Sequence, residues 1–316
     1  MFALERSQIF LTHWQVAGHT SDIPAPGDWL SFDMLGERGL VMRGQDGVIR
    51  AFHNLCRHRG ARVVDGVQPS VKAMLAPYDA DFAAYDLENV LSVNLPDWGT
   101  TLPVNWKSVR DVDNEGYHVA MAHPGLQDLY GRTYRDLSLP DGLTVSIGYF
   151  GDAPGRLWSV KHYVNLSPQA PHLPPHLQKA WSYYGIFPNA VFAFTPEAIQ
   201  FSQEIPISPT ETRVTGRLYR RPNETRAQRV ARYLAYRIDR ETSTEDQQLS
   251  IWSNESMKSQ AFEGFHLSDL EYGVRRHHDG LRRLLPVMHL QTAPKDDEIA
   301  AMNAEMLGRS AAMTQA

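Results

Sequence analysis

Two histidines five residues apart, preceded by acidic residues, form the richest group of candidate reactive side chains. They lie in the stretch NWKSVRDVDNEGYHVAMAHPG, residues 105–125. If this stretch is one helix, Asp111, Glu115 and His118 fall on a single stripe, because their spacings are four and three residues. Burying two carboxylates and a histidine together is costly unless they bind a metal or one another. The stretch therefore predicts a metal site or a buried ionic cluster.

His123 follows His118 by five residues, a spacing that a regular helix would separate by about 140°. Pro124 comes next, and a residue before proline is disfavoured in the helical conformation. We therefore expect the helix to end at His123, whose ring can then turn back toward His118. Two histidines with one carboxylate are typical of mononuclear non-heme iron sites, which keep positions open for O2.

A third metal ligand must come from another segment, and TSTEDQQLSIWSNE, residues 242–255, is the best candidate. Ser243 and Thr244 are expected to cap a helix in which Asp246 shares one face with Leu249. Acidic residues are also common in a first helical turn, because they interact favourably with the helix dipole. Spacing alone does not choose between Glu245 and Asp246.

Two other metal chemistries fit part of this pattern. Glu115-x-x-His118 and Glu263-x-x-His266 have the spacing of di-iron carboxylate helices, but Gly264 and a strand-rich middle argue against a four-helix bundle. A zinc hydrolase would also accept two histidines and an aspartate. It would not explain Cys56 and His58, a Cys-x-His pair in a chain whose other 315 residues contain no cysteine.

The elements that must position these residues change in kind along the chain. Alternating apolar and polar residues with turns at Gly36 and Gly47 predict a small antiparallel β unit in residues 1–67. From residue 68 onward strands and helices are mixed, which predicts an α+β fold. We expect strands at 156–166, 181–194 and 212–220, and helices at 105–123, 226–240, 245–257 and 267–285. The tail from residue 293 is predicted to be a loosely packed helix or partly disordered.

Composition excludes several classes of function. The 316 residues are 42% hydrophobic and 21% charged, with a net charge of −5 and interspersed signs, so neither nucleic acid nor a membrane surface is an expected partner. No apolar run approaches the roughly 20 residues of a membrane span, and the first residues do not resemble a signal peptide. A single cysteine favours a cytoplasmic location.

Three motifs, in this order, resemble those of the catalytic alpha subunits of Rieske non-heme iron oxygenases. Residues 4–64, from LERSQIF to HNLCRHRGARVV, are similar to the start of their Rieske domain. NWKSVRDVDNEGYHVAMAHP resembles their iron-binding helix. SYYGIFPNAVFAF and STEDQQLSIWSNESMKS, residues 182–194 and 243–259, resemble their catalytic sheet and the helix of the third ligand.

This resemblance implies roles for individual residues. His118, His123 and Asp246 would bind Fe(II), and Cys56 and His58 would be the first half of the Rieske cluster site. Glu115 would be the carboxylate that links cluster and iron between neighbouring subunits. Asp111 is a second candidate catalytic acid, because of its place on the predicted stripe and not because of the resemblance. The resemblance further implies a helix-grip catalytic domain, in which a curved antiparallel sheet wraps a long C-terminal helix, here residues 267–285. It also implies a homotrimer, O2 as co-substrate, and a ferredoxin or flavin reductase as electron donor.

The sequence departs from the family at the second half of the cluster site. A Rieske cluster needs two cysteines and two histidines, and the usual second Cys-x-x-His pair is absent. Residues 76–79, APYD, could be aligned with it as substituted ligands. We favour instead the absence of about 60–70 residues near Val67–Pro69. The sequence does not decide whether the protein has lost them or has them in addition to these 316 residues. A partial Rieske-like domain would then occupy residues 1–67 and the catalytic domain 68–316, and a 2Fe–2S cluster would form only if the second ligand pair were supplied.

The substrate is predicted only by class. Glutamate at position 115, where ring dioxygenases usually carry aspartate, resembles members acting on quaternary ammonium compounds. Such a cation could be held in an aromatic cage, and core packing is the alternative role of the same side chains. The candidates are Trp181, Tyr183, Tyr184, Phe187 and Trp252. The predicted activity is hydroxylation or N-demethylation of a quaternary ammonium or aromatic compound; the alternative is a non-catalytic metal-binding or assembly subunit.

Overall fold

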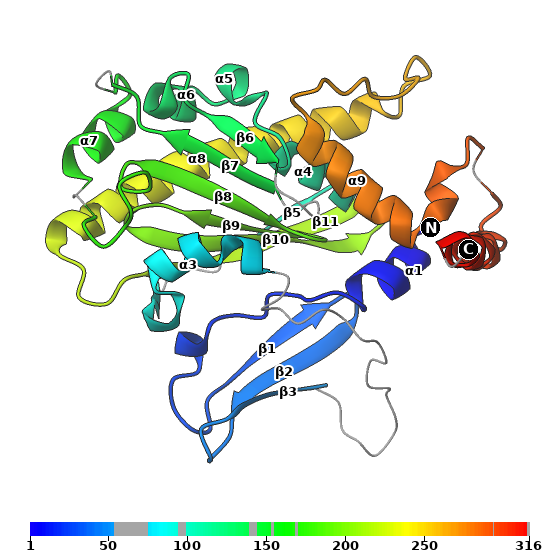
Figure 1. Cartoon of the computed structure of the whole chain (residues 1–316), viewed down its shortest axis with the longest axis horizontal. Coiled ribbons are helices and arrows are strands. Elements are labelled where there is room, and N and C mark those ends of the chain that lie inside the picture. Colours follow the sequence, from blue (N-terminus) through cyan, green and yellow to red (C-terminus); the bar gives the residue numbers. More distant parts are fainter. Residues whose placement is uncertain are drawn as a thin grey trace.

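Two antiparallel sheets organise the described part of the chain (Figure 1). A computed structural model describes residues 1–53, 75–93, 99–138, 144–152, 155–167, 170–292 and 294–314. Cys56, His58 and the predicted boundary at residue 67 lie outside these ranges. The predicted α+β fold class is confirmed.

The smaller sheet has the order β1-β2-β3 and is formed by β1 (Trp29–Met34), β2 (Glu37–Arg43) and β3 (Ile49–His53). Trp29 pairs with Met42 in the first hairpin, and Gly39 pairs with His53 in the second. The first turn places Gly36 at φ +83° and the second places Gly47 at φ +78°, a region that glycine enters without a steric penalty. The small antiparallel unit predicted from the sequence is therefore confirmed.

The larger sheet has the order β4-β11-β10-β9-β8-β7-β6, with β5 paired to β11. Its two longest strands, β10 and β11, pair with each other as one antiparallel hairpin. The strands are β4 (Leu91–Ser92), β5 (Gly99–Leu102), β6 (Arg135–Ser138), β7 (Thr144–Tyr149), β8 (Ala180–Ile186), β9 (Ala190–Phe194), β10 (Ala198–Ser208) and β11 (Glu211–Arg220).

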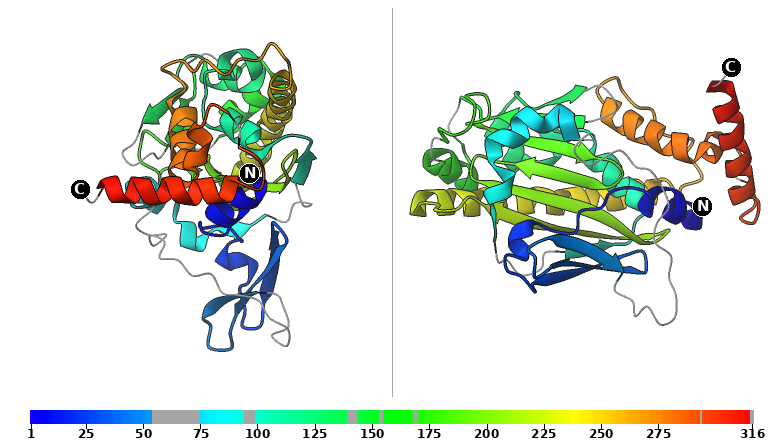
Figure 2. Two further views of the ribbon diagram at one scale, coloured as in Figure 1. Left: turned by 90° about the vertical axis from the view of Figure 1, so that its right-hand side faces the viewer. Right: turned by 60° about the horizontal axis from the view of Figure 1, so that its bottom comes forward.

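Helices cover both faces of the larger sheet. Figure 1 shows α8 passing behind the strands and α3 lying in front of them, and Figure 2 gives two further views of this layering. The helices are α1 (Phe2–Glu5), α3 (Asp79–Tyr85), α4 (Trp106–Asp113), α5 (Val119–Ala122), α6 (Pro124–Tyr130), α7 (Trp158–Leu166), α8 (Arg226–Ser256), α9 (Tyr272–Leu284) and α10 (Ile299–Thr314).

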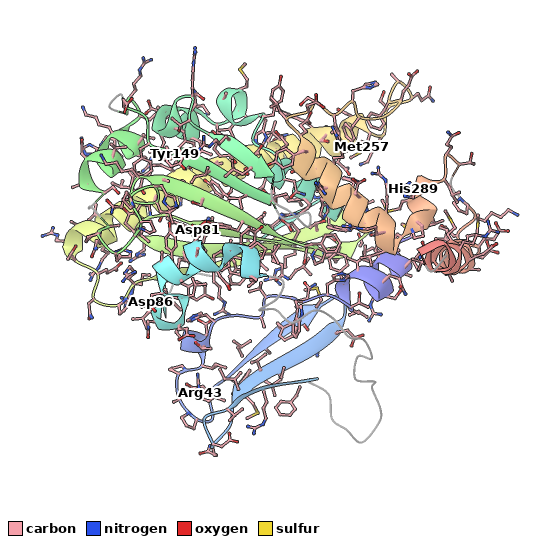
Figure 3. The ribbon with its side chains drawn as sticks, in the orientation of Figure 1. Arg43, Asp81, Asp86, Tyr149, Met257 and His289 are labelled. Carbon is pink, nitrogen blue, oxygen red and sulfur yellow. The ribbon has the colours of Figure 1, made fainter. Side chains whose placement is uncertain are left out.

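Alternation along β8 divides the core into two layers. Tyr184 packs in the cluster beneath α3, and its hydroxyl donates to Asp81 Oδ2 at 2.7 Å, a residue labelled in Figure 3. Trp181 faces the opposite layer, where it packs with Leu234 and Ile238 of α8. Successive side chains of a strand point to opposite faces, so one strand contributes to both layers.

The long helix α8 is one element of 31 residues, so the predicted break between residues 240 and 245 is wrong. Its capping box lies at its beginning, where Thr225 and Gln228 bond to each other's backbone N–H groups. The hydroxyls of Thr242 and Thr244 donate to the carbonyls four residues earlier, so they are satisfied within the helix and cap nothing.

Other predicted elements change type or length. Residues 156–166, predicted as a strand, contain α7, because Val160 and Tyr163 form a buried helical stripe. The helix predicted at 267–285 is shorter and contacts the sheet at β6, whereas side chains of α8 pack with Trp181 of β8. The tail does form a helix, α10. None of the helices in the described ranges is long and apolar enough to cross a membrane.

Candidate metal centre

Three side chains from two distant segments converge on one point. The Nε2 atoms of His118 and His123 lie 3.0 Å apart, and Asp246 Oδ1 lies 3.3 Å from the first and 2.9 Å from the second. Ligands held about 2.1 Å from one metal ion at right angles would lie about 3.0 Å apart. The three atoms therefore have the spacing of a set of ligands on one face of a single metal ion.

A helix break places His118. α4 ends at Asp113, and His118 lies at the start of α5, so the predicted continuous helix over residues 105–123 is wrong. The Gly116 N–H donates to Asp136 Oδ2 at 2.9 Å, away from any helical carbonyl. A Cβ on Gly116 would lie 1.8 Å from the Tyr134 ring, so the loop requires glycine here. The break turns His118 toward α8.

His123 joins two short helices, as its position before Pro124 predicts. It ends α5 and precedes α6 with φ −117° and ψ 84°, outside the helical region, and Pro124 is the first residue of α6. This conformation directs the buried ring of His123 back toward His118, with the two ring centroids 4.9 Å apart. The predicted end of the helix at His123 is confirmed.

Each histidine contacts a carboxylate through its other ring nitrogen. Glu115 Oε1 lies 2.5 Å from Nδ1 of His118, and Glu245 Oε2 lies 2.8 Å from Nδ1 of His123. A carboxylate can only accept, so each Nδ1 carries a hydrogen, and each Nε2 is left to bind a metal ion or a proton. This arrangement orients metal-ligating histidines and increases their basicity. Glu245, which spacing alone could not separate from Asp246, therefore lies on the far side of the His123 ring.

These contacts test whether the donor set fits a metal. With hydrogens on both Nδ1 atoms, two nitrogen lone pairs and a carboxylate oxygen face one another, which is repulsive unless a cation lies between them. Asp246 Oδ1 is buried, and both Nε2 atoms lie within 3.3 Å of it. The donor set therefore fits a mononuclear cation.

The charges of the site also favour a cation. Burial lowers the pKa of His118, but Asp246 and Glu115 outweigh this and raise the pKa to about 10 in the metal-free protein. Burial raises the pKa of Asp246, whereas the contacts with His118 and His123 hold the pKa below its usual value. A proton can occupy this cluster, and a metal ion must displace it.

Asp111 does not join this centre. It belongs to α4, before the helix break, and its Oδ1 accepts a hydrogen bond of 2.8 Å from His278 Nε2 on α9. The predicted stripe of Asp111 with Glu115 and His118 is therefore wrong. Asp111, His277 and His278 form a second group with metal-ligating atoms, but the charges of Arg110 and Lys107 act on His277. These two cations disfavour another cation there.

A cavity of about 330 Å³ opens beside the three converging atoms, between α4, α8 and the larger sheet. Apolar side chains form much of its wall, including Val109, Leu126 and Val191, and the rings of Tyr134, Tyr183 and Tyr236 also line it. This volume lies in the range of small-molecule sites. The cavity is therefore large enough for a small ligand and adjoins the candidate metal ligands.

The predicted aromatic cage is largely wrong. Only Tyr183 of its five candidates lines this cavity. Trp181 and Tyr184 are buried in the two core layers, Phe187 packs against a third cluster, and Trp252 is 57% exposed. Tyr134 and Tyr236, which the sequence did not single out, line the cavity instead.

The di-iron alternative is not supported by the positions of its second pair. Glu263 and His266 are exposed in the segment between α8 and α9. The described ranges contain two clusters of side chains that could hold a metal, one with His118 and one with Asp111, and neither includes Glu263 or His266.

The fold and donor set fit the 2-His-1-carboxylate class of mononuclear centre. Residues 80–286 match the family described as ring hydroxylating alpha subunit (catalytic domain), and residues 13–75 match the Rieske [2Fe-2S] domain. The chain therefore belongs to the ring-hydroxylating alpha subunit family.

Curated relatives match parts of the chain. The glycine betaine monooxygenase oxygenase subunit of Chromohalobacter salexigens is 41% identical over 78 residues, 25% of this chain and 18% of that protein. The carnitine monooxygenase oxygenase subunit of Acinetobacter baumannii is 24% identical over 188 residues, 40% of this chain and 51% of that protein. The chain thus spans about half or less of the length of these relatives.

Solved structures share the fold. A quaternary ammonium Rieske monooxygenase in complex with an inhibitor has a TM-score of 0.70 at 17% identity, covering 89% of this chain and 91% of that chain. Naphthalene 1,2-dioxygenase with bound indole has a TM-score of 0.62 at 17% identity, covering 90% and 89%. At this identity the likeness shows the fold alone.

Membership of the family implies a Rieske 2Fe–2S cluster in addition to the mononuclear iron. The donor set of these 316 residues does not fit the cluster, because Cys56 is the single cysteine and two thiolates are needed. The alignment with the carnitine enzyme has 188 positions but includes only 40% of this chain, about 126 residues. At the other positions, about 62, this chain has a gap. This number is close to the size of the segment of about 60–70 residues that is predicted to be absent.

Proposed function

We propose that this protein is an iron-dependent oxygenase that hydroxylates or N-demethylates a small quaternary ammonium or aromatic compound. The observation that carries the proposal is the convergence of His118 Nε2, His123 Nε2 and Asp246 Oδ1 at one wall of a ligand-sized cavity. The glycine betaine and carnitine relatives support a quaternary ammonium substrate, and a relative named a 2,4-dinitrotoluene dioxygenase component supports an aromatic one.

In this proposal His118, His123 and Asp246 hold Fe(II), which when bound supplies the place where O2 is reduced. Glu115 and Glu245 keep the hydrogens of the two rings on Nδ1, so that both Nε2 atoms stay free for the metal. The apolar cavity walls hold the substrate carbon next to the metal face and exclude bulk water.

The reaction would consume one O2, two electrons and two protons, place one oxygen on the substrate carbon, and release the other as water. If the carbon is an N-methyl group, the hydroxymethyl product loses formaldehyde and a proton and leaves a tertiary amine. The electrons would come from a ferredoxin or flavin reductase system, because the cysteine content of this chain does not supply a cluster of its own.

We further propose that the domains divide at residue 67, that the chain assembles as a homotrimer in the cytoplasm, and that Glu115 lies on the electron path into the iron site. For Asp111 we propose a positioning role, since its side chain holds α9 through His278. Cys56 and His58 are proposed as a remnant of a cluster site. A non-catalytic assembly role is less well supported. A subunit that only assembles with an oxygenase does not need three metal-ligating side chains next to a cavity of ligand size.

Iron content and O2 consumption test the proposal together. The purified chain, reconstituted anaerobically with Fe(II) and supplied with a ferredoxin and its reductase, should consume O2 when glycine betaine or carnitine is added. His123→Ala should abolish both iron retention and substrate-dependent O2 uptake, and His162→Ala on α7 is the matched control. Retained iron with no O2 uptake for any cationic or aromatic compound would favour the assembly role.

A further inference from the structure

One acidic side chain that lines the cavity neither binds the proposed iron nor contacts one of its ligands. Asp239 lies on α8, seven residues before Asp246, and both side chains line the cavity with Ser243 between them on the same helical stripe. Seven residues correspond to a rise of about 10.5 Å along the helix. The two carboxylates therefore occupy different parts of one cavity.

The other acids of the cavity have charged partners. Glu115 and Asp246 contact the histidines of the metal site. Asp113 lies 4.0 Å from Arg110, a buried guanidinium that also contacts Glu204. Asp239 forms no ion pair with any residue of the described ranges, and the side chain of Gln200 favours its charged form. Its charge is thus left without a counter-ion in the part of the chain that the structure describes.

An uncompensated carboxylate in a cavity wall carries a free-energy cost that a bound cation would remove. Burial raises the pKa of Asp239 to about 6, while the Gln200 contact acts in the opposite direction. At neutral pH the group is therefore mostly ionised. Arg240, the only lysine or arginine among the described lining residues, is exposed and belongs to no described ion pair.

The surroundings of Asp239 suit a cation that carries methyl groups. Tyr183 and Tyr236 line the cavity together with Asp239, and the same three residues also line a small adjoining recess between the sheet and α8. Burial raises the pKa of the Tyr183 hydroxyl, and the nearby charge of Asp239 raises it further. Aromatic faces attract ammonium groups, and apolar walls accept methyl groups better than they accept a hydrated ion such as potassium.

We propose that Asp239, with the rings of Tyr183 and Tyr236, selects substrates that carry an alkylammonium group and holds that group in the cavity onto which the iron site opens. This inference rests on the proposed function and decides between its two substrate classes. The same carboxylate also disfavours the binding of a neutral aromatic ring. Such a ring would displace water from the charged group without offering it a counter-ion or a hydrogen bond.

The test compares two ligands of the same shape. Choline and 3,3-dimethylbutan-1-ol differ only in having a quaternary nitrogen or a carbon at the branch point. Their binding to the iron-loaded protein is measured anaerobically by calorimetry, so that no turnover is needed. The wild-type protein should bind choline at least about tenfold more tightly than the alcohol.

Asp239→Asn should weaken choline binding about tenfold or more and change binding of the alcohol less than about twofold. Asp239→Glu, which keeps the charge, should retain the preference for choline. Glu241→Gln is the matched control, because Glu241 is exposed on the same helix and pairs with Arg237. Iron content and thermal melting of every variant verify that the site and fold are intact.

Unchanged choline binding in Asp239→Asn, or a wild-type preference for the neutral alcohol, would overturn the inference. The proposed function fails by a different result. If choline binds through Asp239 but O2 is not consumed with any cationic compound, the cation site stands and the oxygenase does not.

Discussion

The Nε2 atoms of His118 and His123 face each other at 3.0 Å, while each ring directs its Nδ1 atom to a glutamate. The two glutamates come from opposite ends of the sequence segment that forms the site, Glu115 from the loop after α4 and Glu245 from α8. Each histidine is thereby fixed in the tautomer that a metal requires. Four side chains thus prepare the site before any cation enters it.

Glu115→Gln should retain iron and lose reductase-driven turnover. The amide oxygen of glutamine can still accept from His118 Nδ1, so the ring stays in place, but the negative charge is lost. Changes at such outer carboxylates reduce metal affinity or activity about 10–100-fold. Turnover with a chemical reductant should fall less than turnover with the protein reductase. Complete loss of iron would show that Glu115 is itself a ligand, and unchanged turnover would show that it has no part in the reaction.

Metal affinity should rise with pH. Although burial lowers the pKa of His118, Asp246 and Glu115 raise it to about 10, so below that pH the metal-free ring holds a proton. A metal must displace this proton, and each pH unit should therefore tighten binding about tenfold for one proton released. Competition titrations with Fe(II) between pH 6.5 and 8.5 measure this slope. A flat profile would mean that no histidine proton is displaced.

Asp111→Asn should affect stability more than iron binding. The contact between Asp111 and His278 joins α4 to α9, and a hydrogen bond of this kind contributes about 0.5–1.5 kcal/mol. Urea denaturation should show a loss of that size, while the iron content per chain stays at the wild-type level. Loss of iron without loss of stability would return Asp111 to the metal site.

The chain alone should carry no Rieske cluster. With Cys56 as its single cysteine, reconstitution with iron and sulfide should leave no acid-labile sulfide and no Rieske electron-resonance signal. Intact mass spectrometry of the same sample verifies that its mass is 35.7 kDa. Two labile sulfides per chain of this mass would show that other residues replace the missing ligands.

Local sequence rules predicted those parts of the site that depend on local geometry. Pro124 indicated the non-helical conformation of His123, and the turns at Gly36 and Gly47 indicated the small sheet. The break after Asp113 was missed, because it depends on the distant Tyr134 ring and Asp136 carboxylate. Long-range contacts of this kind leave no periodic pattern in the sequence.

The same limit explains the errors on α8 and the cavity. Ser243 and Thr244 have the residue types of a cap, but their helix continues because packing against the sheet favours it and Thr244 bonds to the preceding turn. In the sequence, nothing marks Tyr236 and Asp239 as cavity residues except that they share a helical stripe with Asp246. They line a cavity because of how the sheet lies against α8, which local sequence patterns do not reveal.

The most direct measurement of the central claim is the iron content of two neighbouring variants, Asp246→Ala and Glu245→Ala. The wild-type chain, reconstituted anaerobically and desalted, should hold about one mononuclear iron. Asp246→Ala should lose most of this iron, because Oδ1 lies 3.3 Å and 2.9 Å from the two Nε2 atoms. Glu245→Ala should retain iron with affinity reduced about 10–100-fold. Full iron in Asp246→Ala, or loss confined to Glu245→Ala, would contradict the proposed metal centre.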